Sequence, residues 1–205
     1  VDAWKDKAFT QWAYLDQYDL AQETFLKFVK EDPYNARAAE FLFYAGQVAE
    51  RAGDLGLAAE IWMRIPSEYP NSNLLPRAMF LAGISHYRRG DYPAALEIFQ
   101  RAVDSPGEKA ALNFWIGKTY QIMGEETAAE IAWREAVGID PTGYYSERAR
   151  DILLEREPFT PPLMYDLAYD PKLERAEAEA WMRLEFAIPE GLDISNLGPL
   201  QNDAR

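Results

Sequence analysis

A pattern of two glycines, an alanine and an aromatic residue recurs three times, and it constrains the fold more than any other feature of the chain. The first glycine of each copy is Gly46, Gly83 or Gly117, and a second glycine follows seven residues later. Further on, an alanine precedes a large aromatic residue by four positions, as in Ala58 and Trp62. The copies are spaced 37 and 34 residues apart. Self-similarity at such a period indicates an array of stacked supersecondary units.

The residue types in each copy predict two helices joined by a tight turn. A small glycine and a small alanine let the two helices approach closely, and the aromatic residue fills the space beside them. The second glycine suits the φ > 0 end of the first helix. Asp54 and Asp91 then stand where we expect the N-cap of the second helix, and Pro93 fits its first turn. Pro70 and Pro141 close two of the units.

This pattern resembles the tetratricopeptide repeat (TPR), a unit of 34 residues with the pattern W-x2-L-G-x2-Y…A-x3-F…P. In TPR numbering the first glycine is position 8, the alanine position 20 and the aromatic residue position 24. The chain departs from the pattern at positions 4 and 11, which hold Leu42, Met79 and Asn113, and Ala49, His86 and Tyr120. An earlier copy lacks both glycines but keeps Tyr18, Ala21, Phe25, Phe28 and Pro33. We therefore expect an all-α fold in which TPR-like helix-turn-helix repeats form a right-handed α-superhelix.

The expected repeat array covers residues 1–156. Its repeats span about 1–34, 39–72, 76–109 and 110–143, and a half repeat spans 142–156. The expected helices lie near 3–16, 18–31, 36–52, 55–68, 74–89, 92–104, 108–123, 126–138 and 143–156, since no segment alternates with period two.

Residues 157–205 are expected to be a different region. Pro158, Pro161 and Pro162 predict a linker, with a short helical turn at 163–168. A helix follows at about 172–188, and the tail from Pro189 is expected to be irregular. Because the sequence starts without Met and stops without a capping repeat, we interpret it as a truncated piece of a longer chain, with a downstream region missing.

The composition excludes several functional classes. Asp and Glu number 34 against 21 Lys and Arg, and the net charge of -13 argues against a partner that is a nucleic acid. The absence of cysteine excludes a thiol nucleophile, and the single histidine excludes a metal centre built from several histidines. We expect no metal and no cofactor. The longest apolar runs are far shorter than the roughly 18 residues that a membrane-spanning segment requires.

The sequence also gives little support for catalysis. Carboxylate pairs such as Glu125 and Glu126 are plentiful, but in so acidic a chain they arise by chance, and this pair falls on a turn. We interpret His86 as a buried, hydrogen-bonded histidine between the two helices of its repeat rather than as a catalytic group. No G-x-S-x-G elbow, phosphate-binding loop or dinucleotide fingerprint occurs. We therefore predict no catalytic residues.

The resemblance to TPR proteins implies a ligand-binding groove on the concave side. In such arrays the first helix of each repeat lines the groove with positions 2, 5, 9, 12 and 13. Position 5 is Phe in three successive repeats, which predicts an aromatic stripe with basic and amide residues beside it. The candidate binding residues are Phe43, Gln47, Arg51, Phe80, Tyr87, Arg88, Phe114, Lys118, Gln121 and Tyr144. The stripe suits an extended peptide or a glycan strand. The alternative is that the Phe residues pack under neighbouring helices.

The groove differs from the carboxylate clamp of some TPR adaptors. That clamp relies on Lys at position 5 and Asn at position 9. Here Phe43 and Phe80 replace the Lys, and Gln47 and Ile84 replace the Asn. This difference, together with the acidic composition, argues against binding of an anionic chain terminus.

A more specific resemblance begins after the third glycine-containing copy. The run from Asp140 to Leu154, D-P-T-G-Y-Y-S-E-R-A-R-D-I-L-L, resembles the "P…YYg..A…L" element of soluble lytic murein transglycosylases. The segments 180–189 and 193–200 resemble the link between blocks of the superhelical region in that family. The E-S-x-F-x-x-x-A-x-S and G-L-M-Q runs that hold the catalytic Glu of the family and its support are missing. The resemblance therefore implies the non-catalytic arm of such an enzyme.

That resemblance implies an extracytoplasmic location and a role in holding peptidoglycan or a partner protein beside a catalytic domain. Tyr144 has two interpretations: it staples the turn while Tyr145 packs into the core, or its exposed ring stacks on a sugar. Two other function classes stay open. The run 68–73, E-Y-P-N-S-N, is common in envelope TPR scaffolds such as outer-membrane assembly lipoproteins, and a generic TPR adaptor for peptides is the third possibility.

Overall fold

The fold is that of a computed structural model, which describes residues 1–104, 107–140, 142–158, 170–189, 191–192 and 194. It divides into two compact units, Val1–Thr160 and Pro161–Arg205, and each is treated by itself. The predicted helical turn at 163–168 and the tail from residue 195 lie outside the described residues, as does Pro141.

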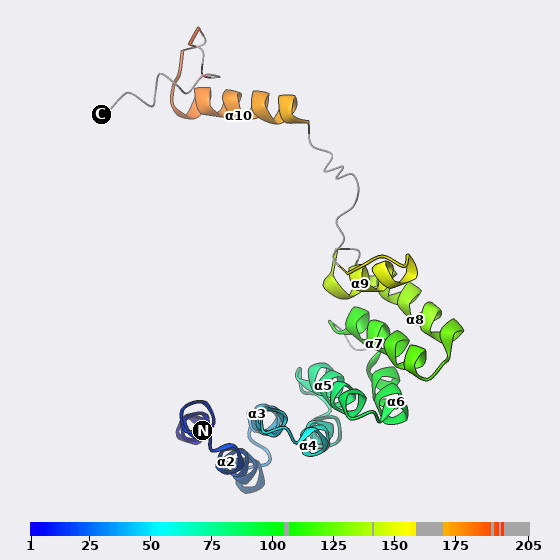
Figure 1. Ribbon diagram of the computed structural model, residues 1–205. Helices are drawn as coiled ribbons and strands as arrows, with labels where there is room; N and C mark the ends of the chain where they lie inside the picture. Colours follow the sequence, from blue (N-terminus) through cyan, green and yellow to red (C-terminus); the bar gives the residue numbers. More distant parts are fainter. Residues whose placement is uncertain (105–106, 141, 159–169, 190, 193, 195–205) are drawn as a thin grey trace. The chain divides into compact units, whose positions relative to one another are not determined.

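Every regular element among the described residues is a helix, which confirms the predicted all-α fold (Figure 1). The first unit contains α1 (Asp2–Phe9), a π-helical turn η1 (Thr10–Tyr14), α2 (Tyr18–Glu31), α3 (Ala38–Arg51), α4 (Leu55–Glu68), α5 (Leu75–Arg88), α6 (Tyr92–Ala102), α7 (Lys109–Ile122), α8 (Glu126–Ile139) and α9 (Tyr144–Leu153). The second unit contains α10 (Pro171–Glu185).

Three helices end differently from the prediction. One of them, predicted at 143–156, ends at Leu153, and Glu155 follows with a φ of 51°. The first predicted helix, 3–16, is split because α1 continues into η1, and the chain then turns at Asp16, whose φ is 53°. The last predicted helix, 172–188, ends at Glu185 instead. Ala187 follows with a φ of 49°, a left-handed conformation that commonly ends helices.

The close approach of the two helices within a repeat depends on the position-8 glycine. Trp62 of α4 is fully buried and lies against Gly46 of α3, where a Cβ would come within 2.6 Å of the ring atom Cδ1. The Trp62 indole N–H donates a hydrogen bond of 3.1 Å to the backbone carbonyl of Phe43. Trp133 of α8 repeats this arrangement with the carbonyl of Phe114, at 3.2 Å. The recurring sequence pattern therefore corresponds to one recurring contact.

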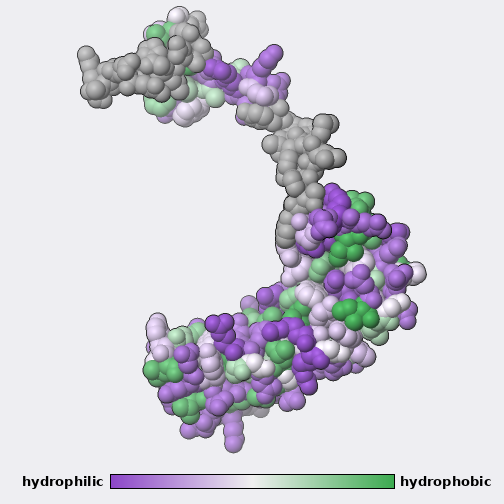
Figure 2. All heavy atoms as spheres, in the orientation of Figure 1, coloured by the Kyte–Doolittle hydropathy of each residue, from purple (hydrophilic) through white to green (hydrophobic). Residues whose placement is uncertain are grey.

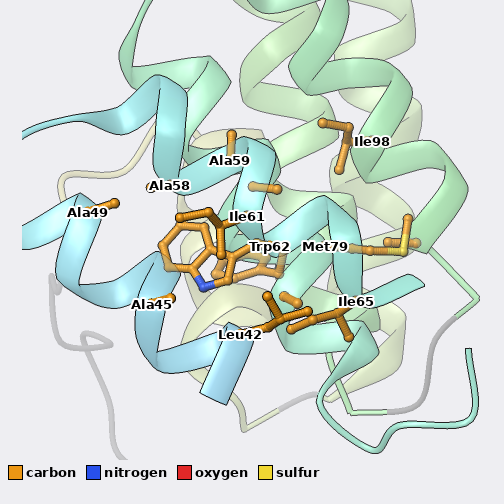
Figure 3. Close-up of a cluster of buried hydrophobic side chains, with 14 of the residues drawn as sticks. Leu42, Ala45, Ala49, Ala58, Ala59, Ile61, Trp62, Ile65, Met79 and Ile98 are labelled. Atoms are coloured by element: carbon orange, nitrogen blue, oxygen red, sulfur yellow. The ribbon is translucent and has the colours of Figure 1, made fainter. Parts of the chain in front are cut away.

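The core of the first unit runs along the array rather than around one centre. Each helix packs against the next in chain order, from α1 to α9, so most core side chains lie between sequence neighbours, while α9 also contacts α7. Figure 3 shows one section, in which Leu42 and Ala45 of α3, Trp62 and Ile65 of α4, and Met79 of α5 meet. On the face drawn in Figure 2, hydrophilic residues predominate, with small hydrophobic patches between them.

The predicted N-caps differ between repeats. Asp54 caps α4, since its carboxylate accepts a hydrogen bond of 2.9 Å from the backbone N–H of Leu57. Asp91 is the N-cap residue of α6, as predicted, but its side chain makes no cap hydrogen bond like that of Asp54. Its Oδ2 lies 3.0 Å from Nδ1 of His86, and this hydrogen bond lowers the pKa of Asp91.

His86 is hydrogen-bonded between the two helices of its repeat, as the sequence analysis expected. His86 keeps 21% of its side-chain surface exposed, so it is less buried than expected. The bond to Asp91 therefore joins the end of α5 to the start of α6, at the turn rather than in the centre of the repeat.

The helix of the second unit is amphipathic. Asp170 caps it by accepting hydrogen bonds from the backbone N–H groups of Lys172 and Leu173. Leu173, Trp181 and Leu184 lie on one side at helical spacing and are all exposed, and no residue of α10 is buried.

Candidate functional site

The helices α3, α5 and α7 carry the positions that TPR arrays direct into their groove. We define the groove face as positions 2, 5, 9, 12 and 13 of the three glycine-containing repeats. A spacing of three to four residues places these positions on one side of each helix. The groove face consists of Glu40, Phe43, Gln47, Glu50, Arg51, Arg77, Phe80, Ile84, Tyr87, Arg88, Ala111, Phe114, Lys118, Gln121 and Ile122.

A hollow of about 420 Å³ opens on the groove face between η1, α3 and α5. It is lined by Trp12 of η1, by Gln47, Glu50 and Arg51 of α3, and by Arg88 of α5. Its volume lies within the roughly 300–1,000 Å³ that is usual for ligand pockets. The structure thus brings three of the predicted candidates, Gln47, Arg51 and Arg88, to one place.

The hollow contains one ion pair and one further cation. Arg88 donates a hydrogen bond of 2.8 Å from Nη1 to Oε1 of Glu50, which joins α5 to α3. Arg51 is exposed and makes no ion pair with any of the described residues. Since Arg88 neutralises Glu50, the guanidinium of Arg51 is the charge that the hollow offers to a ligand.

Most side chains of the predicted aromatic stripe are packed against other side chains and are not open to a ligand. Phe80 and Phe114 are buried, and the ring of Tyr145 from α9 covers both, with centroid distances of 6.4 Å and 5.6 Å. Phe43 is half-buried beside Trp62. Phe80 and Phe114 therefore lie beneath other side chains. This agrees with the alternative interpretation, in which the Phe residues at position 5 pack under neighbouring helices.

The candidates Tyr87 of α5 and Lys118 and Gln121 of α7 make other contacts. Tyr87 packs against Tyr92 and Trp115 at centroid distances of 5.5 Å and 5.0 Å, and burial raises its pKa. Lys118 donates a hydrogen bond of 3.1 Å from Nζ to Oε1 of Gln121. The structure does not bring these residues into the hollow.

Tyr144 and Tyr145 play different parts in α9. Tyr144 keeps 59% of its surface exposed, and its ring meets that of Tyr145 edge to face at 5.1 Å. Tyr145 is half-buried and provides the packing onto Phe80 and Phe114.

An ion-pair network fixes the N-terminal end of the groove face. Glu40 accepts hydrogen bonds from Arg37 Nε at 2.8 Å and from Lys5 Nζ at 2.9 Å. The bond from Arg37, and then that from Lys5, lowers the pKa of Glu40 to about 2. Arg37 also donates to Asp2 at 2.7 Å. Because Glu40 is neutralised by two cations, it leaves no surplus negative charge on the groove face.

The sequence analysis missed Trp12 and Glu50 as members of the hollow. Glu50 stands at position 12 of its repeat and could have been named from the TPR numbering alone. Trp12 belongs to the first copy, which lacks both glycines and so gives no secure numbering. The π-helical turn that contains Trp12 has no recognisable sequence signal.

The described ranges contain neither a cluster of metal ligands nor a membrane-spanning helix. No three Asp, Glu or His side chains lie where they could jointly hold a metal ion in the part of the chain that the structure describes. None of the described helices is both long enough and apolar enough to cross a membrane.

Comparisons with known proteins agree with this architecture. A model of the family described as "Tetratricopeptide repeat" matches residues 13–73 and 76–144, together more than half of the chain. No curated protein matches the chain.

Several solved structures share the fold. One is MamA, which is 23% identical over 68% of this chain and 78% of that chain, with a TM-score of 0.55. MamA 41-end from Desulfovibrio magneticus RS-1 is 15% identical over 91% of this chain and 95% of that chain, with a TM-score of 0.57. A tetratricopeptide repeat protein from Parabacteroides merdae ATCC 43184 is 14% identical, with a TM-score of 0.61; the match covers 74% of this chain and 58% of that chain. At these identities the similarity shows the fold alone.

Proposed function

Because the chain belongs to the tetratricopeptide repeat family, we propose that it is a non-catalytic scaffold that binds an extended, acidic segment of a partner protein on its groove face. The observation that carries this proposal is the hollow around Arg51, where a guanidinium without an ion pair among the described residues lies beside Trp12 and Gln47. A carboxylate side chain of the partner pairs with Arg51, and its neighbouring apolar atoms contact the Trp12 ring.

The charge of the groove face supports an acidic partner. Its fifteen positions hold the cations Arg51, Arg77, Arg88 and Lys118 against the anions Glu40 and Glu50. The whole chain, by contrast, has a net charge of -13. A locally cationic surface on an acidic protein attracts acidic segments to one place and repels them elsewhere.

This ligand differs from the one that the carboxylate clamp binds. A clamp holds the terminal carboxylate of a peptide, and the residues of the clamp are replaced here. An internal acidic segment needs only side-chain carboxylates at the hollow, so the replacement of the clamp residues does not argue against it.

Selection from a library of short random peptides displayed on phage tests the proposal. We expect the enriched peptides to be rich in Asp and Glu. We also expect their binding to weaken as salt is added, because the groove-face charges are exposed. An enriched set without acidic bias would contradict the proposal.

Charge reversal locates the binding. Arg51→Glu should weaken binding of an enriched peptide about tenfold or more, since it removes a charge-assisted hydrogen bond worth roughly 1.5–3 kcal/mol. Arg134→Glu is the matched control: it makes the same change in net charge on α8, where Arg134 pairs with Glu130 of its own helix. Equal weakening by both variants would mean that net charge alone, and not the hollow, governs binding.

A second proposal follows from the resemblance to lytic murein transglycosylases: the chain is the arm of such an enzyme, lies outside the cytoplasm and holds peptidoglycan. The exposed ring of Tyr144, in the run that carries this resemblance, supports it. Co-sedimentation with purified peptidoglycan tests it, and Tyr144→Ala should reduce the retained fraction while Tyr14→Ala, another exposed tyrosine, should not. No retention of the unaltered chain would contradict this proposal and leave the first one standing.

A further inference from the structure

A larger hollow, of about 820 Å³, lies between two turns that join successive repeats. One turn lies between α2 and α3, and the other between α4 and α5, so the two are equivalent in the repeat. Pro33 and Pro70 occupy the same place in them, 37 residues apart. The hydroxyl of Tyr69 donates a hydrogen bond of 3.0 Å to the carbonyl of Pro33, which holds the turns beside each other. None of the lining residues belongs to the groove face.

The lining of this hollow carries no uncompensated charge. Glu68 is the one ionisable acid or base among its lining residues apart from the tyrosines. Arg64 donates two hydrogen bonds to the Glu68 carboxylate, at 2.6 Å and 3.1 Å. A charged ligand would therefore find no counter-ion there and would gain nothing for the water that it loses.

Some polar groups of the lining are already used by the turns, and others are not. Asn35 donates to Asp32, and Ser72 accepts from the backbone N–H of Leu74. The side chains of Tyr34, Asn71 and Asn73 make no hydrogen bond with any residue that the structure describes.

Tyr34 is 98% exposed and makes no ring contact with another aromatic side chain among the described residues. The hollow therefore combines a free aromatic face with free amide groups, each of which both donates and accepts hydrogen bonds.

From this combination we infer that the hollow binds a neutral carbohydrate. The apolar C–H face of a pyranose ring stacks on Tyr34, and its hydroxyls exchange hydrogen bonds with the amides of Asn71 and Asn73. A polyproline segment would require a row of exposed aromatic rings, and the lining has one. The absence of free charge selects a neutral sugar over a phosphorylated or carboxylated one.

Nuclear magnetic resonance of the full chain, labelled with ¹⁵N, tests this inference. Chitotetraose and maltotetraose are the probes, one with acetamido groups and one without. We expect either sugar, added to several millimolar, to shift the side-chain amide signals of Asn71 and Asn73, which Asn71→Ala and Asn73→Ala identify by their loss.

The tyrosine variants provide the control. Tyr34→Ala should raise the dissociation constant about three- to tenfold, the loss expected for one stacking ring. Tyr14→Ala removes a ring that is 82% exposed and lies outside the hollow, and it should leave the dissociation constant unchanged. Because both rings are exposed, neither change should affect folding.

Absence of shifts with both sugars would overturn the inference, as would equal effects of Tyr34→Ala and Tyr14→Ala. A proline-rich peptide that shifted the same amides where the sugars did not would assign the hollow to a peptide instead. Neither the acidic-peptide proposal nor the peptidoglycan proposal rests on a residue that lines this hollow, so failure here leaves both unaffected.

Discussion

Replacing Gly46 by alanine tests the packing that holds each repeat together. The added Cβ would lie 2.6 Å from Cδ1 of Trp62, and Trp62 is fully buried. The indole ring must therefore move by about 1 Å to reach an ordinary contact distance. Such a movement also strains the hydrogen bond from the Trp62 indole N–H to the carbonyl of Phe43.

The size of the effect follows from three contributions. Overpacking of a well-packed core costs about 1–3 kcal/mol. A weakened hydrogen bond adds up to about 1 kcal/mol. The better helix propensity of alanine offsets about 1 kcal/mol of this loss. We therefore expect Gly46→Ala to lower the free energy of unfolding by about 1.5 kcal/mol, and by no more than about 3 kcal/mol.

Gly138→Ala is the matched control. Gly138 lies near the end of α8, and a Cβ there would meet nothing within 4 Å, so helix propensity acts alone. This variant should gain a few tenths of a kcal/mol, up to about 1 kcal/mol. Urea denaturation followed by tryptophan fluorescence and by circular dichroism measures both free energies. If Gly46→Ala stabilised the chain as Gly138→Ala does, the close-approach explanation would be refuted.

Two further predictions concern the ends of the array. Glu40→Gln should lower the free energy of unfolding by about 1 kcal/mol at neutral pH, since water screens these partly exposed ion pairs. The pKa of Glu40 is lowered from 4.5 to about 2 in the folded chain, so its contribution is present above about pH 4.5 and is lost toward pH 2; an equal loss at pH 7 and pH 2 would contradict this. Tyr145→Ala should cost about 2–3 kcal/mol because it uncovers Phe80 and Phe114. Tyr144→Ala, at a mostly exposed ring, should cost clearly less in the same denaturation assay, and equal costs would show that Tyr145 does not carry the packing.

The sequence was sufficient for the features that lie within one repeat. The spacing of Gly46, Ala58 and Trp62 predicted which helices pair and which side chain fills the gap, because each repeat carries its own copy of that contact. The cap at Asp54 followed from the same pattern. At Asp91 the cap position was predicted correctly, but the hydrogen bond was not: a histidine at position 11 binds the carboxylate, and the pattern of the other repeats could not show that competition.

Features that depend on contacts among several repeats could not be predicted from the sequence. Tyr145 reaches both Phe114 and Phe80, and the second of these contacts depends on how α9 lies against α5 across the intervening repeat. Trp12, which lines the hollow, lies in the π-helical turn η1, and the direction of a side chain there cannot be read from the spacing of an α-helix. The Arg51 hollow could therefore be predicted only in part, from Gln47, Arg51 and Arg88.

We propose that the groove face around Arg51 is where the chain holds its partner. Backbone amide chemical shifts, measured with and without an acidic peptide enriched from the phage library, test it most directly. We predict that the perturbed signals belong to α3, the end of α5 and η1, around Gln47, Arg51 and Arg88. Perturbations confined to the second helices α4, α6 and α8, with those signals unchanged, would contradict the claim.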